Sequence, residues 1–261
     1  AALKAIRLFN EPTVIIIKHC NPCGIGSGNS LSEAYGKAFA TDTIAPFGGI
    51  VVVNRSLDSE TASQINKVFT EIIIAPAFEP GVLEMLQKKK DRRLIGYNPT
   101  ELTKPLNALE IKTLQWGYLA QEWDLNNEPA SAWTVVTEKQ PTPQELKALL
   151  FGWKAVSILK SNAIVLCRED QVLGFGIGQT SRIDSTSLAI WKAAKYGHNL
   201  QGSVCASDGF FPYRDTIDTI SAHGIKAVIQ PGGSKGDEAC IQACNELGIT
   251  MIFTGFRHFR H

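Results

Sequence analysis

The sequence predicts an α/β protein made of two subdomains of similar size. Apolar runs rich in β-branched residues, such as 14–17, alternate with segments whose apolar residues recur at helical spacing. Prolines and asparagines break every such period between 125 and 143. We therefore expect a first subdomain over 1–125, a linker over 126–142 and a second subdomain over 143–261.

The first subdomain opens with a helical pattern over 2–9, and the run 14–17 has the composition of a strand buried on both faces. Ser30 and Glu33 have the spacing of a capping box, which predicts a helix over 30–40. The other predicted elements of this half are strand 50–53, helix 58–69, strand 71–75 and helix 79–88. The basic run 88–93 is interpreted as a solvated helix end.

The second subdomain opens with Thr142 and Glu145, which again have the spacing of a capping box. The helix that they start is predicted to run over 143–158, and strand, hairpin, helix, strand, helix and strand follow it. The two halves therefore have a similar alternation of helices and strands, although no repeat is visible residue by residue.

Two glycine-rich stretches, 174–182 and 230–237, are predicted to form turns that open helices. Backbone N–H groups at such turns can hold an anion. In the second stretch Ser234 is the expected N-cap, with Asp237 three residues later. Glycine spacing alone is weak evidence for a dinucleotide site, and its usual acidic partner is not evident.

Composition excludes several classes of function. The 261 residues include 26 Lys and Arg against 25 Asp and Glu, so no strong field recruits nucleic acid or an anionic membrane. The chain has neither an apolar run of membrane-spanning length nor a signal-peptide pattern.

The six cysteines include Cys20 and Cys23, a CxxC that could be half of a zinc site or a redox pair. Cys240 and Cys244 lie one helical turn apart, but no histidine or second CxxC nearby completes a tetrahedral set, and we expect a reducing, cytosolic setting.

Three polar positions precede or follow buried strands. Lys18 and His19 come directly after the run 14–17. An ammonium and an imidazole at the mouth of a buried strand are costly unless both are used or paired, and α/β enzymes usually keep reactive groups at strand ends. Asn162 stands before another apolar run, where on its own it fits an ordinary strand entry.

Aromatic residues gather in two places in the second half. The stretch 207–215 places Phe210 and Phe211 beside charged residues, which is typical of a core but also suits a wall for a flat heteroaromatic ligand. The basic and aromatic end, 256–261, follows the apolar run 250–253 almost directly. We therefore expect this end to be anchored to the fold.

Taken together, these stretches resemble the AICAR transformylase family, the formyltransferase domain of bifunctional purine biosynthesis proteins (AICAR is 5-aminoimidazole-4-carboxamide ribonucleotide). The resemblance spans nearly the whole chain and rests on the joint order and spacing of motifs that are not decisive singly. The motifs are Lys18-His19 with 21–24, Phe47-Gly48-Gly49, Lys160-Ser161-Asn162-Ala163, Gly178-Gln179 with Ser181-Arg182, 207–212, 230–234 and 257–261.

The resemblance implies two cytidine-deaminase-like α/β subdomains, three-layered with mixed sheets, and a homodimer whose active sites lie at the subunit interface. It implies formyl transfer from the co-substrate 10-formyltetrahydrofolate to the 5-amino group of AICAR in the cytoplasm, without a catalytic metal. An IMP cyclohydrolase domain, fused or separate, is a further possible partner. Nucleic acid and membranes are not expected partners.

In the family's pattern, His19 accepts the proton of the attacking amine, and Lys18 is the acid or the cation beside the tetrahedral oxyanion. Asn162 supplies a neutral hydrogen bond to that oxygen. The implied substrate-binding residues are Gly48, Glu71, Phe210, Arg257 and Phe259. The implied folate-binding residues are Phe47, Arg182, Ile183, Pro212, Asp215, Ser234 and Lys235.

The sequence departs from the family pattern at several points. A stretch that grips the substrate phosphate before the first strand is absent, and Trp116, Gly209 and Gly236 stand where the family has other residues. We therefore expect a fragment, missing its N-terminal part, that folds around the site but is weakly active or inactive alone. Two alternatives are a binding-only remnant and a metal-dependent deaminase on the same fold, which stoichiometric zinc would favour.

Overall fold

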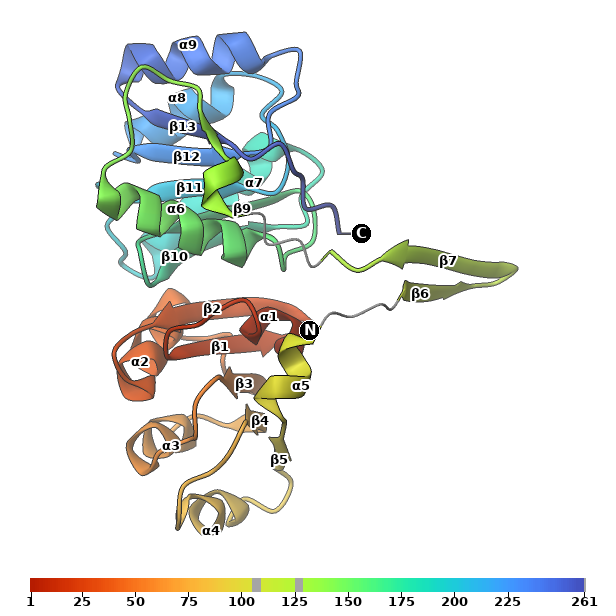
Figure 1. Ribbon diagram of the computed structural model, residues 1–261. Helices are drawn as coiled ribbons and strands as arrows, with labels where there is room; N and C mark the ends of the chain where they lie inside the picture. Colours follow the sequence, from red (N-terminus) through yellow and green to blue (C-terminus); the bar gives the residue numbers. More distant parts are fainter. Residues whose placement is uncertain (105–108, 125–128, 261) are drawn as a thin grey trace.

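The computed structural model describes residues 1–104, 109–124 and 129–260, and within them shows a mixed α/β chain built on two central sheets (Figure 1). The strands of the first sheet are β1 (Thr13–Lys18), β2 (Asn21–Ser27), β3 (Gly49–Val53), β4 (Thr70–Ala75) and β5 (Arg93–Gly96). The helices of this half are α1 (Ala2–Ile6), α2 (Leu31–Thr41), α3 (Ser59–Asn66), α4 (Val82–Gln87) and α5 (Pro99–Thr103).

The second sheet contains β8 (Thr134–Val135), β9 (Ala163–Cys167), β10 (Val172–Ile177), β11 (Val204–Ser207), β12 (Ala227–Gln230) and β13 (Thr250–Phe253). Its helices are α6 (Pro143–Val156), α7 (Arg182–Lys195), α8 (Asp215–Ala222) and α9 (Asp237–Leu247), and a 3₁₀ turn, η1 (Ala130–Ala132), precedes β8. Between the halves, β6 (Leu109–Leu114) and β7 (Gly117–Glu122) form a separate hairpin. The predicted α/β class and the mixed sheets are thus confirmed.

The two sheets repeat one order of elements. Each has an antiparallel pair, β1–β2 or β9–β10, whose first strand borders three mutually parallel strands separated by helices. The strand orders β2-β1-β3-β4-β5 and β10-β9-β11-β12-β13 are therefore equivalent. The edge strand β8 comes from the predicted linker 126–142, of which residues 126–128 lie outside the described part of the chain.

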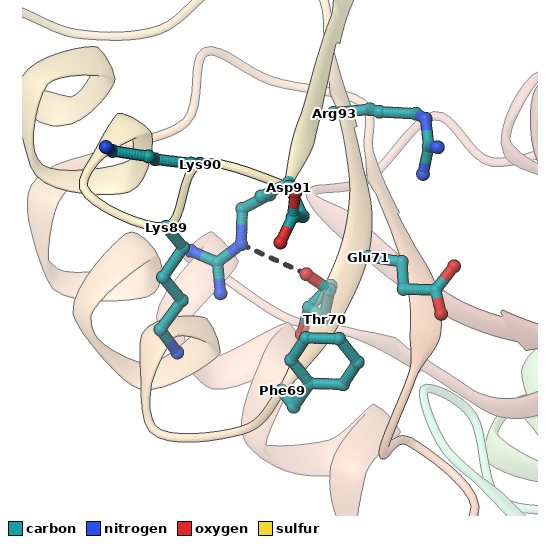
Figure 2. Close-up of a pocket in the computed structure, with 8 residues that line it drawn as sticks. Phe69, Thr70, Glu71, Lys89, Lys90, Asp91 and Arg93 are labelled. Carbon is teal, nitrogen blue, oxygen red and sulfur yellow. Dashed lines mark hydrogen bonds between the residues drawn. The ribbon is translucent and has the colours of Figure 1, made fainter.

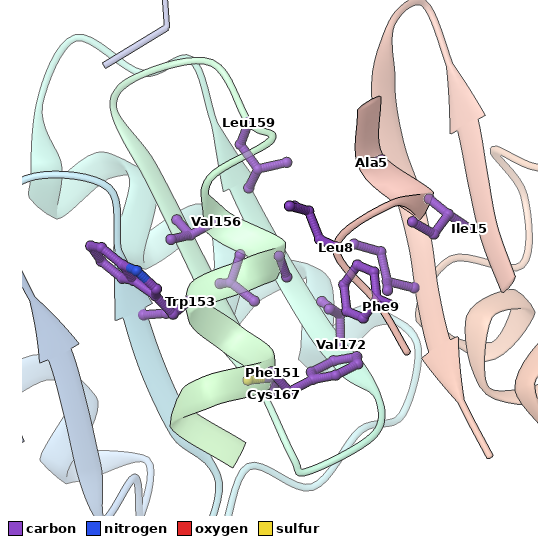
Figure 3. Close-up of a cluster of buried hydrophobic side chains, with 14 of the residues drawn as sticks. Ala5, Leu8, Phe9, Ile15, Phe151, Trp153, Val156, Leu159, Cys167 and Val172 are labelled. Carbon is purple, nitrogen blue, oxygen red and sulfur yellow. The ribbon is translucent and has the colours of Figure 1, made fainter. Parts of the chain in front are cut away.

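The two halves share a hydrophobic core (Figure 3). Leu8 and Phe9, which follow α1, belong to the same buried cluster as Phe151 and Val156 of α6. The rings of Phe9 and Phe151 lie 5.5 Å apart, edge to face. Two further clusters lie under α2–α4 and under α7–α9, so helices cover both faces of each sheet.

Glycines in the second strand of each pair let a helix approach closely. A Cβ added to Gly24 in β2 would lie 1.9 Å from the carbonyl oxygen of Ala38 in α2. A Cβ added to Gly176 in β10 would lie 1.7 Å from the carbonyl oxygen of Ser185 in α7. The two halves therefore repeat a packing device as well as a topology.

This packing corrects two sequence expectations. Residues 21–27 form a strand rather than a loop, and Cys23 lies in that strand. The expected glycine-rich turn over 174–182 begins only at Gly178, which has a positive φ of 69°, because Gly174 and Gly176 lie in β10. Gly174 and Gly176 therefore let α7 pack against β10 rather than help to bind an anion.

We expect Gly24→Ala and Gly36→Ala to change stability in opposite directions. The first substitution forces α2 away from β2 and should lower the free energy of unfolding by about 1–3 kcal/mol. Gly36 lies inside α2 with no atom within 4 Å of an added Cβ, so alanine there should raise that free energy by about 0.5–1 kcal/mol. Urea unfolding monitored by circular dichroism measures both, and a neutral Gly24→Ala would contradict the packing argument.

Other predicted boundaries were partly right. Ser30 caps α2, and Thr142 with Glu145 forms the predicted capping box of α6. Ser234 is not an N-cap, since Gly236 holds that position in α9. The basic run 88–93 is not simply a solvated helix end, because Arg92 is buried and its Nε donates to the Thr70 carbonyl oxygen at 3.0 Å.

The β6–β7 hairpin projects from the body of the molecule (Figure 1). Its large apolar side chains are exposed on both strands and at the turn, and they include Leu109, Ile111, Trp116, Tyr118 and Leu119. A two-stranded hairpin is marginally stable by itself in water.

Among the described residues, no helix is both long and apolar enough to cross a membrane.

Candidate functional site

The turn between β1 and β2 holds the predicted pair Lys18 and His19. His19 and Cys20 are the only two residues between the strands, and both have positive φ, 52° and 64°. Positive φ at both central residues is the feature of a type I′ hairpin turn. The turn leaves His19 exposed at the end of the sheet, while Lys18 Nζ donates to the Phe47 carbonyl oxygen at 2.6 Å.

Three more predicted residues gather beside this turn. Gly48 has a positive φ of 69°, and its N–H donates to the Phe69 carbonyl oxygen at 2.7 Å. A Cβ at Gly48 would lie 3.9 Å from Glu71 Oε1, so the glycine leaves space beside that carboxylate. The rings of Phe47 and Phe69 lie 5.3 Å apart. Lys18, Phe47, Gly48, Phe69 and Glu71, with His19 on the turn, form what we call the first group.

A second group lines a pocket of about 420 Å³ at the start of α7. It contains seven of the predicted site residues: Asn162, Arg182, Ile183, Phe210, Pro212, Asp215 and, from the C-terminal segment, Phe259. Thr180, Ser181 and Tyr213 also line it and were not among the predicted site residues. Phe211, by contrast, is fully buried in the core, as paired aromatics often are.

Asn162 is held by the chain that precedes α7. Its Nδ2 donates to the carbonyl oxygens of Gln179, at 2.9 Å, and Thr180, at 3.2 Å. Both side-chain N–H donors are therefore engaged, and Oδ1 is left as an acceptor. The oxyanion-donor role that the resemblance implies would require one of these two bonds to be released.

Arg182 is buried and forms an ion pair with Asp208. Asp208 is fully buried, accepts from the Ala163 N–H at 2.9 Å, and also accepts from Ser161 Oγ. This carboxylate therefore fixes the segment that carries Asn162. Because its guanidinium is already neutralised, Arg182 is a weak candidate to hold a further carboxylate.

The C-terminal segment is anchored, as expected. His258 is buried, and its backbone N–H donates to the Asp208 carbonyl oxygen at 2.9 Å. Its ring Nδ1 lies 2.9 Å from Asp124 Oδ2. The flanking residues face outward: Arg257 is exposed and its guanidinium lies 4.8 Å from the Phe259 ring centroid. Phe259 thus belongs to the second group, and Arg257 lies against its ring without lining the pocket.

The turn with Ser234 and Lys235 satisfies its own donors. Asp237 Oδ2 accepts from the N–H groups of Gly233, at 2.7 Å, and Ser234, at 3.1 Å. The expected anion cradle is thus occupied by a carboxylate of the chain itself. Lys235 is exposed, and neither it nor Ser234 lines the second-group pocket.

Among the described residues, no hydrogen bond or ion pair joins the first group to the second. Another pocket, of about 530 Å³, lies between the halves. Cys20, next to His19, and Lys160, two residues before Asn162, both line it, together with one side of the β6–β7 hairpin. The predicted catalytic residues themselves do not.

The cysteines are mostly buried thiols. Cys23 is buried, its Sγ donates to the Ile16 carbonyl oxygen at 3.5 Å, and burial raises the pKa of its thiol to about 12. Cys20 is exposed on the turn. Across the part of the chain that is described, no group of three or more His, Cys, Asp or Glu side chains is placed to hold a metal ion.

Comparison with known proteins gives one consistent result. A family model described as AICARFT/IMPCHase bienzyme matches residues 1–192. The bifunctional purine biosynthesis protein PurH of Enterococcus faecalis is 50% identical over 261 residues, 100% of this chain and 50% of that protein. PurH of Chlorobium phaeobacteroides is 48% identical over 263 residues, again 100% of this chain and 50% of that protein. The chain spans about half the length of these curated relatives, and it belongs to the AICARFT/IMPCHase bienzyme family.

Proposed function

We propose that this chain transfers the formyl group of 10-formyltetrahydrofolate to the 5-amino group of AICAR. The observation that carries the proposal is the β1–β2 turn, which holds the His19 imidazole and the Lys18 ammonium at the end of a buried strand. This acyl transfer needs a base to take the proton of the attacking amine and a cation to stabilise the negative oxygen of the intermediate. Support also comes from membership in a family whose description names AICAR formyltransferase activity together with IMP cyclohydrolase activity.

The reaction requires one proton to leave the amine and one to reach the folate. The amine nitrogen of AICAR bonds to the formyl carbon while His19 accepts the amine proton. Lys18 stabilises the negative charge on the formyl oxygen of the tetrahedral intermediate. The C=O double bond then re-forms as the bond from carbon to N10 breaks, and N10 takes the proton that His19 had accepted. Formyl-AICAR and tetrahydrofolate are released.

We assign Asn162 the role of acceptor rather than donor. Its two N–H donors already bind backbone carbonyl oxygens, so Oδ1 is the atom that it offers to a ligand. That oxygen can accept from the substrate amine or carboxamide and so orient the nitrogen before attack. Phe210 and Phe259 supply aromatic surface beside it for a heteroaromatic base.

We propose that the working unit is a homodimer with shared active sites. The first group sits on the β2-β1-β3-β4-β5 sheet and the second at the start of α7 in the other half, and this division supports a site made from the first group of one copy and the second group of the other. The exposed apolar hairpin β6–β7 supports contact with another surface. We further infer that IMP cyclohydrolase activity belongs to a separate domain, and that the enzyme is cytoplasmic.

A labelled formyl group tests the proposed function. The chain is incubated with AICAR and 10-formyltetrahydrofolate that carries carbon-13 in the formyl group, and products are analysed by mass spectrometry. Labelled formyl-AICAR and an equal amount of tetrahydrofolate are expected, at the low rate that the sequence predicts for this chain alone. Failure to form labelled product, although calorimetry shows both ligands bound, would contradict the proposal.

A further inference from the structure

The segment that follows β7 meets the C-terminal segment at one buried hydrogen bond. His258 is 1% exposed, and its ring Nδ1 lies 2.9 Å from Oδ2 of Asp124, whose side chain is 14% exposed. Because an ionised carboxylate can only accept, the Nδ1–H of His258 is the donor. Among the described residues, Nε2 of His258 and Oδ1 of Asp124 are buried without a partner. Within that part of the chain, this bond is therefore the polar contact that fixes the imidazole.

Aromatic rings surround the imidazole. The ring centroid of His258 lies 4.4 Å from that of Trp153 in α6 and 5.4 Å from that of Phe256. Trp153 in turn packs edge-on against Trp133, with the centroids 6.3 Å apart. An imidazole that loses its acceptor in such surroundings stays buried with an unsatisfied N–H, which is unfavourable. Asp124 is therefore needed to keep this part of the C-terminal segment in its place.

The backbone around His258 lies along the strand entry that carries Asn162. The His258 N–H donates to the Asp208 carbonyl oxygen at 2.9 Å. Two residues further on, the Arg260 carbonyl oxygen accepts from the Ser161 N–H at 3.1 Å. The position of His258 thus sets where the C-terminal segment passes the second group.

The neighbours of His258 face outward. Arg257 and Phe259 are exposed while His258 is buried, so a fixed His258 turns both neighbours away from the core. Phe259 lines the pocket of the second group, where its ring suits the heteroaromatic base of AICAR. The Arg257 guanidinium lies 4.8 Å from the centroid of that ring, and an exposed guanidinium suits the phosphate of a ribonucleotide.

Asp124 is held by the base of the β6–β7 hairpin. It is the second residue after β7, and the ring centroid of the preceding Trp123 lies 3.1 Å from Lys4 Nζ of α1. The same Nζ lies 3.3 Å from Oε2 of Glu110 in β6. The hairpin base is therefore tied to the first half through Lys4 and to the C-terminal segment through Asp124.

We propose that Asp124 is a positioning residue for AICAR, acting through its hydrogen bond to His258. That bond holds Arg257 and Phe259 in the arrangement that binds the nucleotide. Asp124 is not among the residues that line the pocket of the second group, so it acts on the substrate only through the C-terminal segment. This inference rests on the proposed function.

The groups that serve the chemical step should survive the loss of this bond. Asn162 remains held by the carbonyl oxygens of Gln179 and Thr180. Phe69 and Glu71 of the first group line a separate pocket at the start of β4 (Figure 2). The loss should therefore appear in the KM for AICAR rather than in kcat.

Kinetics of three variants test the inference. Asp124→Ala should raise the KM for AICAR about tenfold and leave kcat and the KM for 10-formyltetrahydrofolate within about twofold. Asp124→Asn should bring the KM for AICAR back to within about threefold of the wild type, because its amide oxygen can still accept from the Nδ1–H. Glu122→Ala is the matched control, since Glu122 is an exposed carboxylate at the end of β7, and it should keep the wild-type KM.

A double-mutant cycle tests whether Asp124 acts through the imidazole. His258→Phe keeps an aromatic ring against Trp153 but removes the Nδ1–H, so it should raise the KM for AICAR by the same factor as Asp124→Ala. Combining the two changes should add less than about twofold. A combined loss of about a hundredfold would mean that the two residues act independently, and would overturn the inference. If Asp124→Ala does not fold, His258→Phe carries the comparison of KM with kcat.

Calorimetric titration with AICAR separates this inference from the proposed function. Binding about tenfold weaker to Asp124→Ala than to the wild type, without formyl transfer by either, would support the positioning role and count against the proposed function. Formyl transfer with an unchanged KM for AICAR in Asp124→Ala would overturn the inference and leave the proposed function intact. A lower kcat at an unchanged KM would also overturn it, because Asp124 would then support the chemical step instead of nucleotide binding.

Discussion

Replacing His19 by asparagine is expected to lower kcat for formyl transfer by about a hundredfold to ten-thousandfold, the usual contribution of a general base. Asparagine is chosen because His19 has a φ of 52°, and asparagine tolerates that left-handed conformation. The turn should therefore persist while the base is removed. Initial rates at saturating AICAR and folate, together with the thermal midpoint, measure the two effects separately.

Cys20→Asn is the matched control for the turn. Cys20 is the other central residue, with a φ of 64°, and its side chain is exposed. Its replacement should leave the rate within about twofold, since asparagine is favoured at both central positions of such turns. Equal losses in the two variants would mean that turn geometry, rather than the imidazole, sets the rate.

Mixing two inactive variants tests whether sites are shared. His19→Asn alters the first group and Asn162→Ala alters the second. In a dimer with shared sites, a mixed pair has one site built from two intact groups. Random pairing should then restore about a quarter of the wild-type activity, because half of the dimers carry one intact site of two. No recovery after denaturation and joint refolding would place both groups of a site in one chain.

The elements that could be predicted were those with a strong local signal. The apolar run 14–17 became β1, and Thr142 with Glu145 forms the predicted capping box of α6. Ser30 caps α2, but the Glu33 carboxylate accepts from the Asn29 N–H, so the predicted capping box is only half formed there. Strand β2 was missed because Gly24 and Gly26 carry no side chains to show an alternation. Their role becomes visible only once α2 lies against them.

The candidate site residues could be proposed from the sequence, but their division into two groups by the fold could not, since each group mixes residues expected to serve catalysis, substrate binding and folate binding. Phe69 was missed because nothing local distinguishes it, whereas its contact with Phe47 depends on how β3 and β4 pair. The resemblance implied that Arg182 contacts folate, but in the structure Arg182 forms an ion pair with Asp208, which is distant in sequence. Ion pairs of this kind, between residues far apart in the sequence, decide which cations remain available to a ligand, and the sequence alone does not reveal them.

Asp208→Ala is expected to lower the free energy of unfolding by about 3–5 kcal/mol, the largest stability effect that we foresee. The carboxylate is fully buried and neutralises Arg182, which is 8% exposed. Its removal leaves a buried guanidinium unpaired and takes the acceptor from the Ala163 N–H. Urea unfolding gives the free energy, and AICAR binding by the surviving folded protein should weaken because Asn162 adjoins Ala163.

Asp218→Ala provides the matched control, since Asp218 also pairs with an arginine, Arg214, but at the surface. Solvent screens that pair, so its loss should not shift the unfolding midpoint measurably. Asp208→Asn should fall between the two, because its amide oxygen can still accept from Ala163 while the charge on Arg182 stays uncompensated. If Asp208→Ala and Asp218→Ala had equal effects, the ion pair with Arg182 would not be what holds the Asn162 segment in place.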